Sequence, residues 1–253
     1  MKRIAAVAGL AVSTLVQGQN LVNNGGFESV TGGSSGHIGV NGIGLAGWTA
    51  NRLSGDPQAT PNYSFALVGT AAQFSENGTG VYSTWSLTGG PQVTLLGTIP
   101  DAFRGNIIVV EALHEWVKTE LTTTVSGLTP NGNYTLTFDW AAAQQKGWNG
   151  PTFSGWQGSI GAATFDTTTP ALSPGSFSGW GTFEFNFTAG PTGSEVLSFI
   201  AYETGGGLPS FSLLDNVQVS PVVVPEPGEY AGAFAGLLVV AGIARKIRAN
   251  QAK

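Results

Sequence analysis

The amino-acid sequence predicts an all-β protein in which two antiparallel sheets pack face to face. Composition is the first indication: Gly accounts for 38 of the 253 residues, only 10% of the residues are charged, and 10% are aromatic. This mixture suits short strands joined by many turns, whereas helices favour Ala, Leu, Glu and Lys. The second indication is that no domain-sized linker interrupts residues 20–220, which are enough for one sandwich with a full core.

The third indication is the alternation of apolar and polar residues, which has the period of a strand. It is clearest at 117–125, at 134–140 and at 182–188, and apolar positions recur at 197–201 and 211–219. Pro130-Asn131-Gly132-Asn133 predicts a turn between the first two segments, and the Gly-rich stretch 32–47 predicts a long loop. About ten strands are expected in total.

The N-terminal segment has the three parts of a secretory signal peptide. Met1-Lys2-Arg3 is followed by an apolar stretch from Ile4 to Val16, and small residues stand at positions 16 and 18. We therefore expect residues 1–18 to be a signal peptide that signal peptidase cuts between Gly18 and Gln19. An uncleaved anchor or a short buried helix is the alternative, although the stretch is short for a membrane span.

The C-terminal segment, residues 221–253, reads as a sorting tail. Pro225-Glu226-Pro227 precedes an apolar run at 230–244 that contains no charge, and a basic cluster of Arg245, Lys246 and Arg248 follows. As a helix the run would be about 22 Å long, short of a bilayer core of about 30 Å, so snorkelling arginines and local thinning would have to complete a transmembrane helix. The basic cluster should stay on the cytoplasmic side.

This order of parts resembles the PEP-CTERM sorting signal. The resemblance implies that an exosortase in the inner membrane of Gram-negative bacteria cleaves near the Pro-Glu-Pro element. It also implies a transient stay in the inner membrane, followed by release to the cell envelope or the extracellular matrix, often in a biofilm where polysaccharide is made. The alternative is an ordinary tail anchor.

Charge and cysteine content exclude several kinds of function. Between the two end segments, four cations face thirteen acids, a net charge of −9 that repels phosphate backbones, so nucleic acid is not an expected partner. The sequence contains no cysteine, which excludes disulfides, thiolate zinc sites and a cysteine nucleophile.

Three segments of the middle region, 19–220, resemble galactose-binding-like jelly rolls, a fold shared by many carbohydrate-binding modules. They are 20–28 followed by Gly47-Trp48, the hairpin region 125–138, and Leu214-Asp215-Asn216-Val217-Gln218-Val219. The resemblance implies a two-sheet antiparallel jelly-roll sandwich and supports the fold better than any ligand.

Calcium is the one cofactor that the sequence suggests. Asp215 is in phase with the apolar residues of the last strand, and a carboxylate that faces a core must be neutralised, paired or bound to metal. The jelly-roll resemblance implies that Glu28 and Asp215 meet at one structural calcium ion. The alternatives are a bulge that turns Asp215 outward, or hydrogen bonds from backbone amides.

Four tryptophans are candidate sugar platforms, because sugar rings stack on exposed aromatic faces. Trp148 and Trp156 fall in a stretch with the character of a loop, and Trp85 and Trp116 flank strands, whereas Trp48, Trp140 and Trp180 are expected in the core. The alternative is that all of them are structural.

Signals of catalysis are poor. The pattern Gly32-Gly33-Ser34-Ser35-Gly36 lacks the strand and helix that a nucleophile elbow needs, and no catalytic residue is assigned. Glu111, Glu115 and Glu120 could supply the two carboxylates of a glycosidase only if two of them converge. The sequence therefore favours a non-enzymatic envelope or matrix protein with weak polysaccharide contact, and its alternatives are a secreted polysaccharide hydrolase and a purely structural matrix protein.

Overall fold

The fold is all-β, as the sequence predicts, and its strands form two large antiparallel sheets. The computed structural model describes residues 19–32, 36–39, 42–55, 64–68, 105–112, 117–144, 151–173, 178–204 and 210–222. The strands are β1 (Val30–Thr31), β2 (Gly36–His37), β3 (Gly44–Leu45), β4 (Trp48–Gly55), β5 (Ser64–Leu67), β6 (Ile107–Glu111), β7 (Val117–Ser126), β8 (Asn133–Gln144), β9 (Thr152–Ile160), β10 (Ala163–Asp166), β11 (Ala171–Leu172), β12 (Gly181–Thr188), β13 (Ser194–Glu203) and β14 (Ser210–Pro221).

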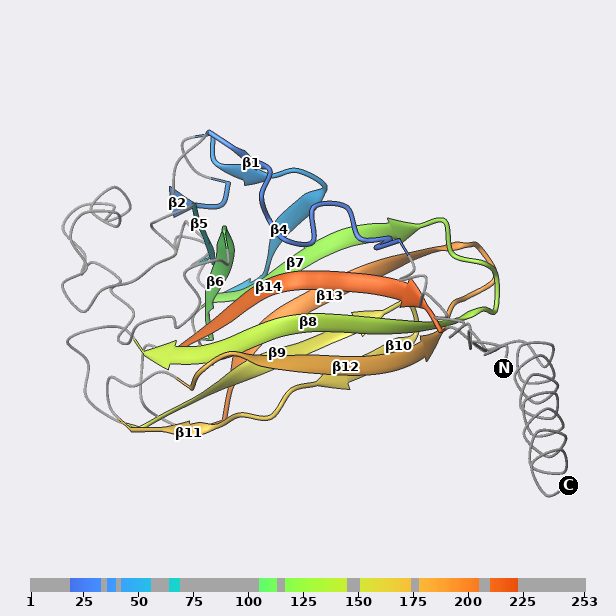
Figure 1. Ribbon diagram of the computed structural model, residues 1–253. Helices are drawn as coiled ribbons and strands as arrows, with labels where there is room; N and C mark the ends of the chain where they lie inside the picture. Colours follow the sequence, from blue (N-terminus) through green and yellow to red (C-terminus); the bar gives the residue numbers. More distant parts are fainter. Residues whose placement is uncertain are drawn as a thin grey trace, which may run out of the picture. The chain divides into compact units, whose positions relative to one another are not determined.

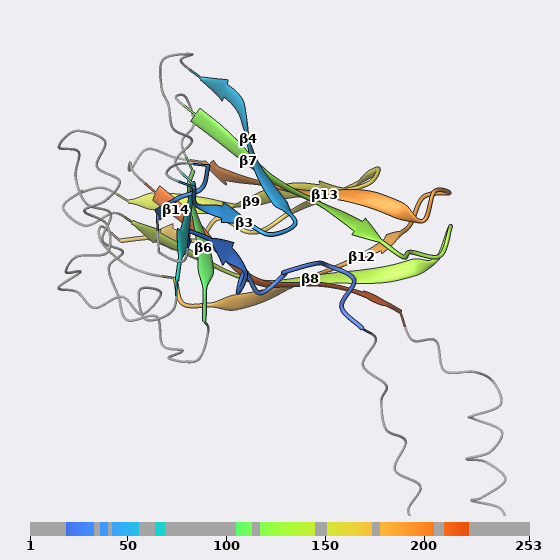
Figure 2. The same ribbon diagram turned by 90° about the horizontal axis from the view of Figure 1, so that it is seen from above.

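Sheet I runs in the order β10-β9-β13-β7-β4, with β11 paired to β9, and sheet II runs in the order β12-β8-β14-β6-β5-β2. The two short strands β1 and β3 pair separately. From β7 to β9, and again from β12 to β14, each strand lies in the other sheet from the one before it, so the chain passes from β7 in sheet I to β8 in sheet II, and from β12 back to β13 (Figures 1 and 2). This crossing between two antiparallel layers confirms the predicted jelly-roll sandwich.

The predicted turn between β7 and β8 is confirmed. Gly132 donates its N–H to the carbonyl of Thr129 at 2.9 Å, and Asn131 has a φ of 58°. Asn tolerates this left-handed conformation better than most residues. The hydroxyl of Tyr134 accepts the N–H of Thr129 at 2.7 Å, which fixes the turn to the first residues of β8.

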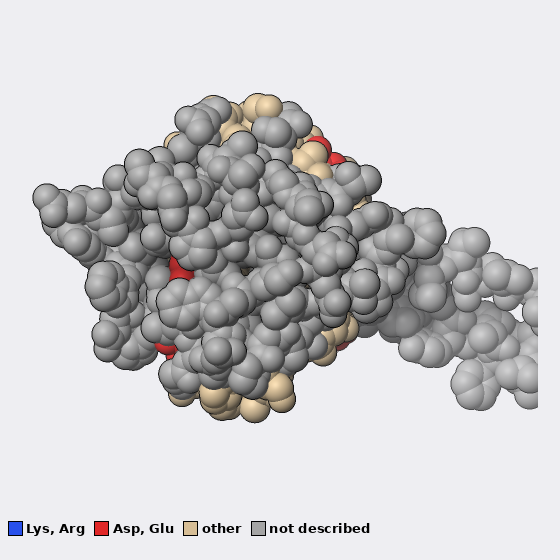
Figure 3. Space-filling model, turned by 90° about the vertical axis from the view of Figure 1, so that its left-hand side faces the viewer, with Lys and Arg blue, Asp and Glu red and all other residues tan. Residues whose placement is uncertain are grey.

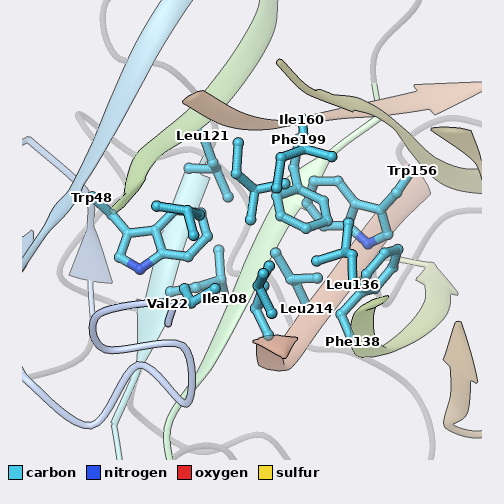
Figure 4. Packing of buried hydrophobic residues seen from close by; sticks show 14 of the residues in the cluster. Val22, Trp48, Ile108, Leu121, Leu136, Phe138, Trp156, Ile160, Phe199 and Leu214 are labelled. Atoms are coloured by element: carbon cyan, nitrogen blue, oxygen red, sulfur yellow. The ribbon is translucent and has the colours of Figure 1, made fainter. Parts of the chain in front are cut away.

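Aromatic and aliphatic residues together fill the space between the sheets (Figure 4). Phe138 meets Phe199 edge to face with ring centroids 5.0 Å apart, and Trp156 meets Phe199 in the same way at 5.8 Å. Pairs with this geometry add about 0.5–1.5 kcal/mol to the burial of their area. Trp48, expected in the core, packs against Phe27 with centroids 5.3 Å apart.

Three side-chain hydrogen bonds join β9 of sheet I to β14 of sheet II across the core. Ser154 Oγ donates to the carbonyl of Phe211 at 2.9 Å, and Trp156 Nε1 donates to the carbonyl of Leu213 at 2.9 Å. Ser212 Oγ donates in the opposite direction, to the carbonyl of Gly155 at 2.8 Å. Because each polar group is buried with a partner, these bonds fix the relative register of the two sheets without leaving an unmet donor.

A bulge in β14 changes which face its residues occupy. The register with β8 shifts between Asp215 and Gln218, and Asn216 has a φ of 51°. Leu214, Val217 and Val219 belong to the core cluster as a result, although an unbroken strand would not place all three on one face. Asp215 therefore lies on the other face of sheet II from Val217 and Val219, which corrects the phase expected from the sequence.

The start of the sandwich domain, which we call the body (residues 19–221), is hydrogen-bonded to its last strand, β14. Leu21 donates its N–H to the carbonyl of Val219 at 3.0 Å. The side chain of Asn20 donates to the carbonyl of Val217 and accepts the N–H of Val219, both at 3.0 Å. The first residues of the body are thus hydrogen-bonded to its last strand.

The chain divides into two compact units, residues 1–221 and residues 222–253. The predicted signal peptide 1–18, its cut between Gly18 and Gln19, and the predicted sorting tail with its helix 230–244 lie wholly or largely outside the described residues, so they stay predictions. Within the described part of the chain, no helix is long and apolar enough to span a membrane.

Candidate functional site

Of the four predicted sugar platforms, only Trp156 lies among the described residues, and the prediction for it is wrong. Its side chain has no exposed surface, lies in the core cluster, and uses its indole N–H for the bond to Leu213. Trp156 follows the strand alternation of β9, a strand that the Gly- and Gln-rich sequence around it concealed. Trp85, Trp116 and Trp148 lie outside the described residues.

The outer face of sheet I carries a different apolar feature, along its central strand β13. Leu197, Phe199 and Ala201 point into the core. The alternate residues therefore lie on the outer face, and we call Val196, Ser198, Ile200 and Tyr202 the β13 strip. Val196 is 54% exposed, and Ile200 and Tyr202 are partly exposed. The strip is about 20 Å long.

Polar residues flank the β13 strip on both sides. On β7, Thr124, Thr122 and Glu120 stand opposite Val196, Ser198 and Ile200. On β9, Ser159 and Gln157 stand opposite Ser198 and Ile200. The hydroxyls of Ser159 and Ser198 are 3.1 Å apart, and Asn51 Nδ2 donates to Thr122 Oγ1 at 3.1 Å. The outer face therefore presents the apolar side chains of Val196, Ile200 and Tyr202, with the buried Ser198 between the first two, and rows of hydroxyl, amide and carboxylate groups on both sides.

A short segment, Thr167–Thr169, bounds the strip at its Tyr202 end. The hydroxyl of Tyr202 donates to the carbonyl of Thr167 at 2.8 Å, and the hydroxyls of Thr169 and Thr204 are 3.2 Å apart. The segment crosses β9 directly over Gly155, where a Cβ would come within 2.8 Å of the Thr168 carbonyl oxygen. Only glycine leaves room for this close approach.

Burial raises the pKa of the Tyr202 hydroxyl, and the carboxylate of Asp166 raises it further. Tyr202 therefore stays neutral at physiological pH and acts as a hydrogen-bond donor. Its ring is held by the bond to Thr167, so a ligand that stacks on it would meet a fixed surface.

Sequence reasoning missed the β13 strip, although a signal was present. In 196–202 both phases of the strand carry apolar residues, whereas the neighbouring strand β7 has Thr and Glu on its outer phase. Only one face of this sheet packs on the core. A strand with apolar residues on both of its faces therefore indicates apolar side chains on the exposed face as well.

The two predicted calcium ligands, Glu28 and Asp215, lie next to the neighbouring strands β6 and β14. Glu28 Oε1 accepts the N–H of Asn106 at 3.0 Å, just before β6. Asp215 Oδ1 accepts the N–H of Asn216 at 2.6 Å, and Leu214 pairs with Ile108 of β6. Asp215 is 6% exposed, and its partner on β8 is another acid, Asp139. The described residues contain no group of three or more His, Cys, Asp or Glu side chains that could hold a metal ion.

The oxygen-only donors at Glu28 and Asp215 suit calcium, so we propose that they would hold it together with carbonyl oxygens. Melting curves of the full chain should then rise by several degrees with excess calcium relative to chelator, because an ion that binds only the folded state stabilises it. Asp215→Asn should remove most of that difference. Coincident curves for the wild type in calcium and in chelator would contradict the site.

A second acidic feature lies at the end of the sandwich where β6 ends and β14 begins. Glu111 is 9% exposed, and burial raises its pKa to about 8, with a further contribution from the charge of Glu203. Ser210 Oγ donates to Glu203 Oε2 at 3.0 Å. Figure 3 shows the left-hand side of the molecule as drawn in Figure 1, where several acidic side chains reach the surface.

Comparison with known proteins gives a fold likeness and no family. No protein-family profile matches the chain, and no curated protein matches it. A family 61 carbohydrate-binding module in complex with beta-1,4-galactotriose is 13% identical, with a TM-score of 0.44 over 81% of this chain and 99% of the module. A second carbohydrate-binding module, of family 4, is 16% identical, with a TM-score of 0.31 over 79% and 99% of the two chains.

The enzymatically active domain of tailspike protein 4 from bacteriophage CBA120 also matches. It is 12% identical with a TM-score of 0.43, and the match covers 80% of this chain. The chain spans only 21% of that phage protein's length. All three likenesses concern the fold alone.

Proposed function

We propose that this chain is an exported, non-enzymatic protein of the cell envelope or extracellular matrix, and that its sandwich binds polysaccharide at the β13 strip. The observation that carries the proposal is the apolar line of Val196, Ile200 and Tyr202 between two polar rows. Sugar rings have apolar C–H faces and polar edges, so a chain lying along β13 would place its ring faces on the strip. Its hydroxyls would then meet Thr122, Gln157 and their neighbours.

The shape of the site favours weak binding. The strip lies on a sheet face and buries little of a ligand, and an open face leaves sugar hydroxyls largely hydrated. Repetition along a polysaccharide, or many protein copies in a matrix, would compensate through avidity.

The test is binding of the full chain to a panel of β-linked glycan oligomers. Replacing both Val196 and Ile200 with threonine should weaken binding by roughly five- to twentyfold, since each contact loses a few tens of Å² of apolar area at about 25 cal/mol/Å². Val222→Thr is the matched control, because Val222 is a similarly exposed valine, at 39%, outside sheet I. Equal affinity of the double variant and the wild type would remove the strip as the site.

The proposed export and location of the protein depend on the two terminal segments, with signal peptidase and exosortase as the processing enzymes. Replacing Pro225-Glu226-Pro227 with alanines should leave the protein in the inner-membrane fraction, because the cleavage element would be lost while the apolar run and the basic cluster remain. Fractionation and mass determination of the product measure this. Normal export and trimming of the triple variant would contradict sorting through this motif.

A secreted polysaccharide hydrolase is the second candidate, and the Glu111–Glu203 interaction is the observation that favours it. Glycosidases use two carboxyl groups, one of them with a raised pKa. Glu111 is almost fully buried, however, so a buried, protonated carboxyl group beside Glu203 accounts for the pair without catalysis.

A further inference from the structure

Carboxylates lie on both sides of the β13 strip at the level of Ile200. Glu120 on β7 pairs directly with Ile200. On the other side, Ile200 pairs with Gln157 of β9, which pairs with Asp166 of β10. Glu120 is partly exposed and Asp166 is exposed. Three strand spacings separate the two acids, about 14 Å, and the strip runs between them.

The side chains described on this outer face are neutral or acidic. The body as a whole carries four cations against thirteen acids. Two of the four, Arg52 and Lys118, belong to strands β4 and β7 of sheet I. Because acids outnumber cations by nine, the electrostatic field of the body attracts cations and repels anions.

We propose that the ligand of the β13 strip is a β-linked polysaccharide of amino sugars with free ammonium groups; this inference rests on the proposed function and names its ligand class. When a pyranose ring lies flat on Ile200 and Tyr202, its equatorial substituents project sideways, toward β7 on one side and toward β9, with β10 beyond it, on the other. Successive rings of a β-1,4-linked chain are turned over, so their amino groups project to alternate sides. Glu120 lies one strand spacing from the strip on one side, and Asp166 lies two strand spacings away on the other.

The expected preference is moderate and sensitive to salt. An exposed ammonium–carboxylate pair contributes a few-fold in affinity, so two pairs give about tenfold. Exposed charges are screened over about 8 Å at physiological ionic strength, so added salt should reduce this preference while the apolar contacts persist. A polysaccharide of uronic acids should be excluded, because its carboxylates would approach Glu120 and Asp166.

The experiment compares three soluble hexamers on the full chain, held in a detergent without sugar groups, at a pH below the pKa of the sugar ammonium. These are β-1,4-linked glucosamine, the same oligomer fully N-acetylated, and an oligomer of uronic acid. The glucosamine hexamer should bind about tenfold more tightly than the acetylated one at low salt. The uronic acid hexamer should not bind, and about 0.5 M salt should abolish the difference between the first two.

A double variant, Glu120→Gln with Asp166→Asn, should lose the preference for free amino groups, so that it binds the glucosamine and acetylated hexamers with equal affinity. Glu184→Gln on β12 removes one exposed carboxylate from sheet II and serves as the matched control. Glu184→Gln should keep the preference. If Glu184→Gln, which removes one charge, weakened the preference half as much as the double variant, which removes two, the overall charge of the protein and not the strip would be responsible.

Failure of this inference differs from failure of the proposed function. If the acetylated hexamer binds as tightly as the glucosamine hexamer and Val196→Thr/Ile200→Thr still weakens it, the strip binds glycans but the amino-sugar preference is overturned. If none of the hexamers binds in any condition, both the ligand class and polysaccharide binding at the strip are overturned.

Discussion

Replacing Glu111 with glutamine is expected to flatten the dependence of stability on pH between about 4.5 and 8. In the wild type the pKa of Glu111 rises from 4.5 to about 8 on folding, because burial and the charge of Glu203 both disfavour its carboxylate. The folded protein then binds more protons than the unfolded chain in this range. The stabilisation is therefore fully present below pH 4.5 and is lost as pH rises through about 8.

The wild type should lose up to roughly 4–5 kcal/mol of unfolding free energy across this window, since one pKa unit corresponds to about 1.4 kcal/mol. Urea titrations at several pH values measure it. Glu184→Gln, a substitution at an exposed acid, should leave the slope unchanged. A wild-type curve that is level from pH 5 to 8 would mean that Glu111 ionises freely.

The same glutamine variant separates the two candidate functions. If Glu111 is a catalytic acid, Glu111→Gln should abolish release of reducing sugars from any polysaccharide that the wild type degrades. If its role is structural, no such release is present in the wild type, and only the stability profile changes.

Trp156→Ala should reduce the unfolding free energy by about 3–5 kcal/mol, the cost typical of a large aromatic removed from a core. It would also leave the carbonyl of Leu213 without its indole donor and break one of the links between β9 and β14. Trp156→Phe keeps an aromatic ring against Phe199 but loses the indole donor, so it should cost less than the alanine variant. Chemical denaturation followed by circular dichroism measures both variants.

These two variants also check the corrected role of Trp156. A surface platform for sugars would show the opposite pattern, in which glycan binding falls and stability hardly changes. Loss of stability in the order Ala greater than Phe is the outcome that a core residue predicts.

Much of the fold could be predicted from the sequence, because a strand with one buried face alternates apolar and polar residues, and this alternation is visible in the sequence. The alternation at 117–125, 134–140 and 182–188 became β7, β8 and β12, and the turn at Pro130-Asn131-Gly132-Asn133 joined the first two. What failed was local. Asp215 was assigned to the apolar phase of β14, but the bulge at Asn216 adds a residue and reverses the phase after it.

The candidate site was harder to predict because it depends on which strands lie side by side. Glu120, Gln157 and Asp166 are distant in the sequence and meet beside Ile200 only through the order β10-β9-β13-β7. The pairing and register of strands so far apart in the chain cannot be read from a single sequence. Tryptophan, the residue type that the sequence analysis favoured for sugar binding, also fits a sandwich core when its indole N–H finds a partner there, as in Trp156.

The position of β14 has a consequence for the order in which this molecule can assemble. β14 is the last strand of the body, yet it lies inside sheet II between β8 and β6, and its end also receives the hydrogen bonds of Asn20 and Leu21. A ribosome or translocon that has delivered everything up to residue 209 has delivered a sheet with its central strand missing. Closure must then wait for the last dozen residues of the body and pair them with segments synthesised much earlier, and contacts of such long range make folding slow. Until that moment the edges of β6 and β8 are open, so a chain stalled before residue 210 is the form of this protein most exposed to aggregation and proteolysis.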